Sequence, residues 1–442
     1  MPSPLKSSRL RRILVAYTVN RLGSVVGLVA LSLAVFDHTH SALAVGTLLF
    51  AWQALPAFVV PAVIARVEVS ARRSELSGLY FFEAVVTSAL AVLLWHFWLP
   101  AILLLAALDG TATLAASALL RAQVARTARD QVEEKPEGAQ PDERIEADAQ
   151  EAERKANAAL NVALSVAFVA GPVLGGVVVA AASASAALFI DVGSFLICGA
   201  LLIGLHPHVE EAGGTSVRAR MRAAWTHINE APSLRALLLT EAVALIFIES
   251  GGPIEVTYVK ATLHAGDRGY GLLVTSWGAG AVFASVVFAR SVRRPLGTML
   301  SMGIFALGAA FVGFALAPSL ALACIAAFVG GVGNGLEWPS LISLVQRITP
   351  QHLHGQLMGA VESLAALSLA IGLLLGGVLV ALSSARVAFL AIGLGAAATT
   401  AAFVRLTLTG LEPRAESSLE TPAMGDPQDE VGGPLPHVPT PT

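Results

Sequence analysis

The sequence predicts an all-α integral membrane protein in which twelve transmembrane helices form two parallel six-helix repeats. Three observations support this prediction: the composition, the spacing of the apolar runs, and a similarity between the two halves of the chain. Of the 442 residues, 55% are hydrophobic and only 13% are charged, and the mean hydropathy is +0.71. A soluble domain carries about 25% charged residues, so a water-soluble protein of this size is excluded.

Twelve apolar runs are long enough to cross a bilayer, because one crossing needs about 20 residues. They cover residues 12–36, 43–65, 76–96, 98–122, 156–182, 185–205, 235–259, 269–290, 296–317, 319–346, 356–382 and 385–408. The first run is longer than the apolar part of a signal peptide, so we expect it to be retained as a span.

The basic residues support this count, because cytoplasmic loops are enriched in Lys and Arg. With the N-terminus in the cytoplasm, 24 of the 28 basic residues fall on the cytoplasmic side. Lys260, Arg268 and Arg386 fall outside, and Arg21 lies within the first run. We therefore expect a multi-pass protein of the bacterial inner membrane with both termini in the cytoplasm.

The two halves share sequence patterns at constant shifts. "GTLLFAW" at 46–52 resembles "GLLVTSW" at 271–277, and the same shift of 225 residues carries Asp109 onto Asn334. "GPVLGGVVVA" at 171–180 resembles "GLLLGGVLVA" at 372–381, a shift of 201 residues. The shifts differ by 24 residues, as expected if an acidic segment is inserted in the first half only. Halves of equal topology are parallel repeats about an axis along the membrane normal.

The predicted organisation follows from these patterns. Helices 1–4 occupy residues 1–125, and 126–155 form an acidic cytoplasmic insertion with ten acidic against six basic residues. Helices 5–6 occupy residues 156–206, and a central cytoplasmic loop covers residues 207–233. Helices 7–12 occupy residues 234–409. Residues 410–442 are Pro-rich without apolar periodicity, which is typical of a disordered tail.

"DHTHSALAVGTLLFAWQALPAF" at 37–58 and "SLVQRITPQHLHGQLMGAVES" at 343–363 resemble the major facilitator superfamily, and in particular its bacterial efflux branch with the enterobactin-exporter-like proteins. The resemblance covers about residues 9–408. "GPVLGG" resembles the antiporter motif of drug:proton exporters, with Ala167 in place of its leading glycine; the matching residues are Gly171, Pro172, Gly175 and Gly176. "PAVIARVEVSARR" resembles the family's cytoplasmic gating loop at Arg66, Arg72 and Arg73, although Pro61 and Ala65 replace its glycine and aspartate. The resemblance implies the major facilitator fold, with spans 1, 4, 7 and 10 lining a central cavity.

Charged residues inside the spans are the first candidates for a transport pathway, because a charge in hydrocarbon is costly unless compensated. Arg21, beside Asn20, lies about 14 Å into the first span, and Asp109 lies about 16 Å into the fourth from the opposite face. Both depths are near the midplane, so we expect Arg21 to be held by Asp109, by a substrate anion, or by each in turn. A permanent ion pair that only fixes packing is the structural alternative.

The second half carries acids without basic partners. Glu241 and Glu249 lie on the seventh span and Glu337 on the tenth, where Asn334 takes the place of Asp109. A desolvated carboxyl group without a partner can take up a proton, which a proton-coupled carrier needs. The stretch "SGGP" at 250–253 is expected to break the seventh span, as at transporter gates, whereas Glu255 is expected to be interfacial.

A polar stripe on the fifth span, Asn157, Asn161 and Ser165, is expected either to line the cavity or to bond a neighbouring helix. For Glu83 and Glu362 we favour interhelical hydrogen bonding over gating contacts. The sequence contains no phosphate-binding loop motif of the kind found in ATPases. It also shows no catalytic nucleophile with a partner base, and no histidines at the spacing of metal ligands.

The predicted function is a secondary transporter, not an enzyme, without cofactor or metal. It exports a small amphipathic molecule (a drug, siderophore or secondary metabolite) in exchange for protons by alternating access. The alternative is an uptake or facilitator carrier for a polar metabolite. The expected partners are the substrate, protons and the lipid bilayer. A monomer is expected, and the net charge of −3 gives no indication of nucleic acid binding.

Overall fold

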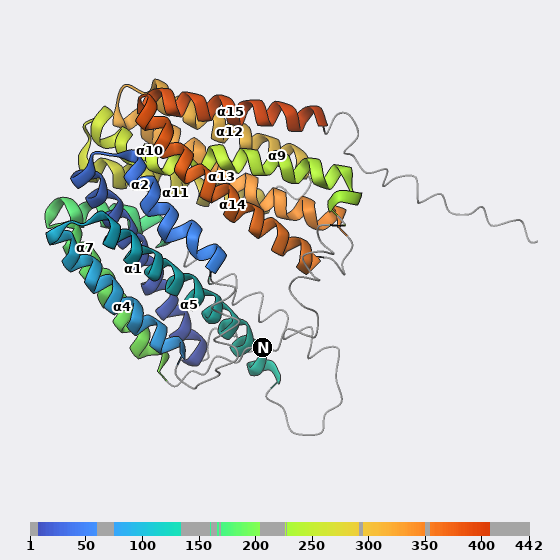
Figure 1. Ribbon diagram of the computed structural model, residues 1–442. Helices are drawn as coiled ribbons and strands as arrows, with labels where there is room; N and C mark the ends of the chain where they lie inside the picture. Colours follow the sequence, from blue (N-terminus) through green and yellow to red (C-terminus); the bar gives the residue numbers. More distant parts are fainter. Residues whose placement is uncertain are drawn as a thin grey trace, which may run out of the picture.

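The computed structural model describes residues 8–59, 75–133, 160, 166–167, 169–203, 226, 228–290, 295–349 and 354–406. Every element in these ranges is helical (Figure 1). Ten of the described helices are long and apolar enough to cross a membrane. Two shorter apolar helices, Val169–Ala181 and Ala385–Thr399, coincide with the fifth and twelfth predicted runs. The predicted all-α membrane fold is confirmed.

The first half contributes one group of helices to the fold. They are α1 (Ser8–Thr39), α2 (Ala42–Leu49) with the π-helical turn η2 (Phe50–Ala54), α4 (Glu75–Leu93) with the 3₁₀ turn η3 (Leu94–His96), α5 (Leu99–Glu133), the helix Val169–Ala181, and α7 (Ala184–Leu202). Ser41 and Ser183 cap α2 and α7 by accepting the backbone N–H three residues on, which satisfies donors that a helix start leaves free. Because α5 runs to Glu133, the acidic insertion does not begin as a loop at 126. Its remainder from 134 lies outside the described residues.

The second half contributes α9 (Pro232–Glu249), α10 (Gly251–Thr257) with the π-helical turn η4 (Tyr258–Thr262), α11 (Gly266–Arg290), α12 (Leu296–Leu316), α13 (Leu320–Ile348), α14 (His354–Leu382) and α15 (Ala385–Leu406). The seventh span is therefore α9, α10 and η4 in succession. Its predicted break is milder than expected. Ser250, between α9 and α10, keeps right-handed helical angles of φ −64° and ψ −20°, so the span is interrupted at one residue and continues.

Glycines of the two repeated motifs make equivalent contacts within each half. A Cβ on Gly171 would lie 2.7 Å from Val25 of α1, and Gly376 of α14 faces the carbonyl of Ser250 in the seventh span. In both halves the motif helix thus approaches the first helix of its own half so closely that only glycine fits. Small residues at such contacts are typical of helices that pack in lipid.

The same motifs also join the halves. A Cβ on Gly176 would lie 3.2 Å from the Cα of Gly271 in α11, and one on Gly377 would lie 2.7 Å from the Cα of Leu43 in α2. The fifth span therefore meets the eighth, and the eleventh meets the second, as a twofold relation between parallel repeats requires.

The two halves meet at one end of the molecule and diverge toward the other (Figure 1). At the joined end, one continuous core includes residues of both halves, among them Leu33, Leu48, Ile102, Ile254, Val259 and Phe389. Toward the start of α1, a separate core belongs to the first half alone; it includes Leu10, Ile13, Leu76, Leu120 and Leu202. Lys260 adds an ion pair across the joined end, because it contacts Asp37 of α1 and, at 2.6 Å, Asp267 of α11.

Candidate functional site

Arg21 is held by groups of its own half. Its guanidinium donates a hydrogen bond to Ser117 Oγ of α5 and lies 5.3 Å from the ring centre of Tyr17, one turn earlier on α1. No ion pair joins it to Asp109, although the structure describes both side chains. The expected pairing is thus wrong for this state of the protein.

Asp109 has partners of its own. Its side chain is 6% exposed; Oδ2 accepts from Trp52 Nε1 at 2.9 Å and Oδ1 accepts from Thr87 Oγ1 at 2.7 Å. Trp52 comes from the π-helical turn η2, a local irregularity that often marks functional positions. The carboxylate is therefore satisfied by two neutral donors rather than by a charge.

The expected pairing fails because depth along a helix does not determine which residues face each other. Arg21 meets α5 at Ser117, two turns beyond Asp109 or about 12 Å along the axis. The two depths were counted from opposite faces on separate helices, and the relative offset of those helices is decided by packing.

Two further acids are buried in the first half. Glu83 on α4 is 0% exposed and Asp191 on α7 is 3% exposed. Asp191 packs against α1, where a Cβ on Gly27 would lie 2.6 Å from its Oδ2, and it accepts from Ser194 Oγ at 3.0 Å. Sequence reasoning missed Asp191, although an acid inside the apolar run 185–205 is the signal that would have found it.

Glu83 interacts with the neighbouring helix α5. Its carboxyl group lies within reach of the Thr113 hydroxyl, which agrees with the interhelical contact favoured for it. Asn20 Nδ2, on a residue 1% exposed, has no hydrogen-bond partner among the described residues. Glu83 also lies within electrostatic reach of Asp109, Asp191 and Arg21.

In the second half, Glu241 of α9 and Glu337 of α13 form a buried carboxyl pair. They are 2% and 1% exposed and lie close enough to interact with each other. Neither oxygen of Glu337 has a partner with hydrogen-bond geometry. Pro339, two residues on, lacks the N–H that would continue the α13 ladder, so the pair lies beside a weakened stretch of helix.

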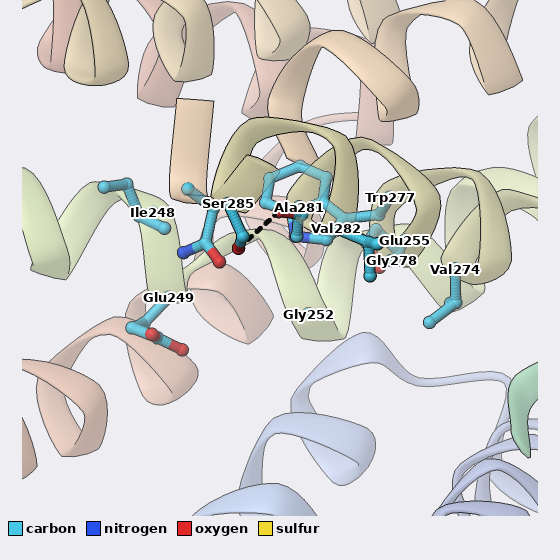
Figure 2. Close-up of a pocket in the computed structure, with 11 residues that line it drawn as sticks. Ile248, Glu249, Gly252, Glu255, Val274, Trp277, Gly278, Ala281, Val282 and Ser285 are labelled. Atoms are coloured by element: carbon cyan, nitrogen blue, oxygen red, sulfur yellow. Dashed lines mark hydrogen bonds between the residues drawn. The ribbon is translucent and has the colours of Figure 1, made fainter. Parts of the chain in front are cut away.

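A cavity of about 400 Å³ has walls from α9, α10, α11 and α13 (Figure 2). Neither member of the pair lines it, but its wall includes Asn334, which lies one helical turn from Glu337 on α13. Glu249 and Glu255 contribute carboxyl groups, Trp277 an indole, and Asn334 an amide. None of the eleven residues that line it is basic. Glu255 is thus a cavity residue, and its interfacial depth in the membrane stays a prediction.

The remaining candidates divide into two groups. Gly171, Pro172, Gly175 and Gly176 are all buried and lie at contacts with α1 or α11. Glu362 is exposed on α14, and no interhelical hydrogen bond joins it to another of the described residues. Arg66, Arg72 and Arg73 of the gating loop and Asn157, Asn161 and Ser165 of the polar stripe lie outside the described residues.

Comparison with known proteins agrees with this architecture. A family profile described as Major Facilitator Superfamily matches residues 237–432. The chain is 27% identical over 241 residues to the uncharacterized MFS-type transporter YfiS of Bacillus subtilis (strain 168), which covers 50% of this chain and 56% of the relative. It is 25% identical over 276 residues to the multidrug efflux pump Tap of Mycobacterium tuberculosis (strain ATCC 25618 / H37Rv), covering 60% of this chain and 65% of the relative. The matched regions thus span less than two thirds of the relatives' length.

Solved structures show the same fold. The nucleoside transporter NupG superposes with a TM-score of 0.68 at 12% identity, covering 91% of this chain and 99% of that one. A bacterial homologue of the human lysosomal transporter Spinster, in an inward-facing and occupied conformation, gives a TM-score of 0.65 at 12% identity, covering 93% and 98%. These relatives and neighbours are transporters and not enzymes. In its fold, in the profile match over residues 237–432 and in its relatives, the chain resembles transporters of the major facilitator superfamily, and the curated relatives include a bacterial multidrug efflux pump.

Proposed function

We propose that the chain is a proton-coupled exporter that moves a small amphipathic molecule across the bacterial inner membrane by alternating access. The observation that carries the proposal is the Glu241–Glu337 pair, two buried carboxyl groups from different helices without a base between them. Two such groups in a low dielectric repel when both are ionised, so together they favour holding a proton. A site that binds and releases one proton is what coupling requires.

The cavity supports the transport step. Glu249 lines the cavity and lies within electrostatic reach of Glu337, so a substrate bound there would change the charge balance of the pair. A proton on the pair and a substrate in the cavity would then weaken each other's binding, and such mutual weakening is what an exchange of substrate for protons requires. The relative Tap is a multidrug efflux pump, which agrees with this direction of transport.

Alternating access is supported by the way the halves meet. With the N-terminus in the cytoplasm, the joined end lies on the outer side and the protein is in an inward-facing state. Lys260, Asp37 and Asp267 then close the outer side, because Lys260 bridges α1 of one half and α11 of the other. Outward opening has to separate Lys260 from Asp37, while Asp267 moves with its own half.

Everted membrane vesicles test the proposal. In vesicles with an acidic lumen, addition of ethidium or of the neutral amphipathic molecule chloramphenicol should dissipate the pH gradient only when the protein is present. Glu241→Gln should abolish this response. Glu230→Gln, the same change at an exposed residue before α9, is the matched control and should retain it.

Two results would contradict the proposal. Substrate equilibration without any change in the pH gradient would indicate a facilitator, and a response of opposite sign would indicate uptake together with protons. A full response from Glu241→Gln would remove the carboxyl pair from the coupling mechanism.

A further inference from the structure

The cavity of the second half combines negative charge with apolar walls. Glu249 is the last residue of α9 and Glu255 lies within α10, with Gly252 between them on the cavity wall (Figure 2). Ile248 and Val274 supply aliphatic surface. A site with two carboxyl groups and an apolar lining repels anions and offers no advantage to a strongly hydrated inorganic cation.

The two carboxyl groups have no internal base to neutralise them. No lining residue is basic, and Lys260, which follows on the same span, is already engaged by Asp37 and Asp267. Glu249 lies within electrostatic reach of Glu337 and Glu255, which are both acids. A bound cation would supply the positive charge that the lining of the cavity lacks.

Trp277 adds a recognition element that an acidic cluster alone would lack. Its indole lines the cavity and is positioned from behind by Phe311, whose ring centre is 6.1 Å away. Gly330 of α13 leaves the space that the indole occupies, since a Cβ there would lie 2.8 Å from Cε3 of the ring, and Gly331 lets α13 approach the backbone carbonyl of Trp277. Tryptophan is the most effective aromatic partner of an organic cation.

We propose that this cavity is the substrate site and that it selects an amphipathic organic cation. The cationic centre lies between Glu249 and Glu255 and against Trp277, and the apolar body contacts Ile248 and Val274. The inference rests on the proposed export function and adds the class of substrate and the half of the molecule that binds it.

Binding by the purified full-length protein, without any gradient, tests the inference. Tetraphenylphosphonium and tetraphenylborate have the same shape and opposite charge. Isothermal titration should show binding of the cation and at least about tenfold weaker binding of the anion. Equal binding of the two ions would show that only hydrophobicity is recognised and would overturn the inference.

Substitutions locate the site. Glu249→Gln and Glu255→Gln should each weaken binding of tetraphenylphosphonium about tenfold, while Glu230→Gln leaves it unchanged. Trp277→Ala should weaken binding and Trp277→Phe should largely restore it, because phenylalanine keeps an aromatic face. Unchanged affinity in both glutamine variants, with melting temperatures like that of the parent, would overturn the proposed site.

The two proposals can fail separately. If proton-coupled transport of chloramphenicol persists in vesicles while the purified protein binds both ions alike, only the cation inference fails. If the protein binds tetraphenylphosphonium as expected but no compound affects the pH gradient, the site stands and the coupling proposal fails.

Discussion

The two halves of the molecule use equivalent positions of the repeat in different ways. In the first half, Trp52 donates to Asp109, and Thr87 completes the partners of that carboxylate. In the second half the equivalent positions are Trp277 and Asn334, and both line a cavity. Replacing one carboxylate by an amide leaves the tryptophan without an acidic partner, while the acids of the second half lie on the neighbouring seventh span.

The two halves differ in the interaction partners of their buried polar side chains. The first half engages Arg21 through Ser117 and Asp109 through two donors. In the second half the partner of Glu337 is another buried acid, Glu241. Two carboxyl groups that share a buried site repel each other when both are ionised, so this pair points to function rather than stability. Five predictions test the comparison.

The largest expected effect separates coupling in the two halves. Glu337→Gln should abolish substrate-dependent proton movement in everted vesicles, because an amide cannot exchange a proton. Asp109→Asn should retain coupled transport in whatever fraction of the protein folds. The comparison would be reversed if Asp109→Asn lost coupling and Glu337→Gln retained it at equal expression.

For the free energy of unfolding, substitution of Asp109 should have the larger effect and substitution of Glu337 the smaller one, the reverse of their expected effects on coupling. Asp109→Ala leaves the Trp52 N–H and the Thr87 O–H unpaired and should cost about 2–4 kcal/mol of stability. Glu337→Gln should cost less than about 1 kcal/mol, because it removes a repulsion between buried acids. Thermal unfolding in detergent measures both, and equal losses would contradict the division into structural and functional acids.

The contact between the halves should be sensitive at the glycine motif. Gly176→Val would force a side chain against Gly271 of α11 and should destabilise the packing by about 1–3 kcal/mol. Gly193→Val is the matched control, because no atom outside its own helix lies within 4 Å of the position its Cβ would take. Similar melting temperatures for the two variants would show that the approach at Gly176 is not tight.

The ion pair across the joined end should have a smaller effect. Asp37 is 48% exposed, and such a pair contributes up to about 1 kcal/mol. Loss of the pair in Asp37→Asn should make the outer side open more often, so labelling of a cysteine introduced on the outer side should rise by no more than about fivefold. Asp267→Asn should raise this labelling less, because Asp267 and Lys260 belong to the same half. A larger response to Asp267→Asn would show that Lys260 does not hold the halves together through Asp37.

The smallest expected effect is the coupling between Arg21 and Asp109. Because each has its own partners, the stability losses of Arg21→Ala and Asp109→Asn should add to within about 0.5 kcal/mol in the double variant. A coupling energy well above this value would mean that the two side chains pair in another state of the transport cycle.

The fold class, the number of spans and the parallel repeat could be predicted from the sequence. These follow from properties that are local along the chain: apolar runs of membrane length, the alternation of basic loops, and motifs at constant shifts. Intramembrane acids such as Asp109, Glu241 and Glu337 could also be found this way, because a charge in an apolar run is conspicuous without any knowledge of packing.

Which of these residues contact each other could not be predicted from the sequence. The rise of 1.5 Å per residue gives a depth, but the rotation of each helix and its offset from its neighbours depend on side-chain packing. Arg21 therefore meets Ser117 instead of Asp109, Glu241 meets Glu337, and Glu255 lines the cavity. Glycine contacts set these offsets, since Gly27 brings α1 against Asp191 and Gly376 brings α14 against Ser250. Such contacts join residues far apart in the chain, so no local pattern could reveal them.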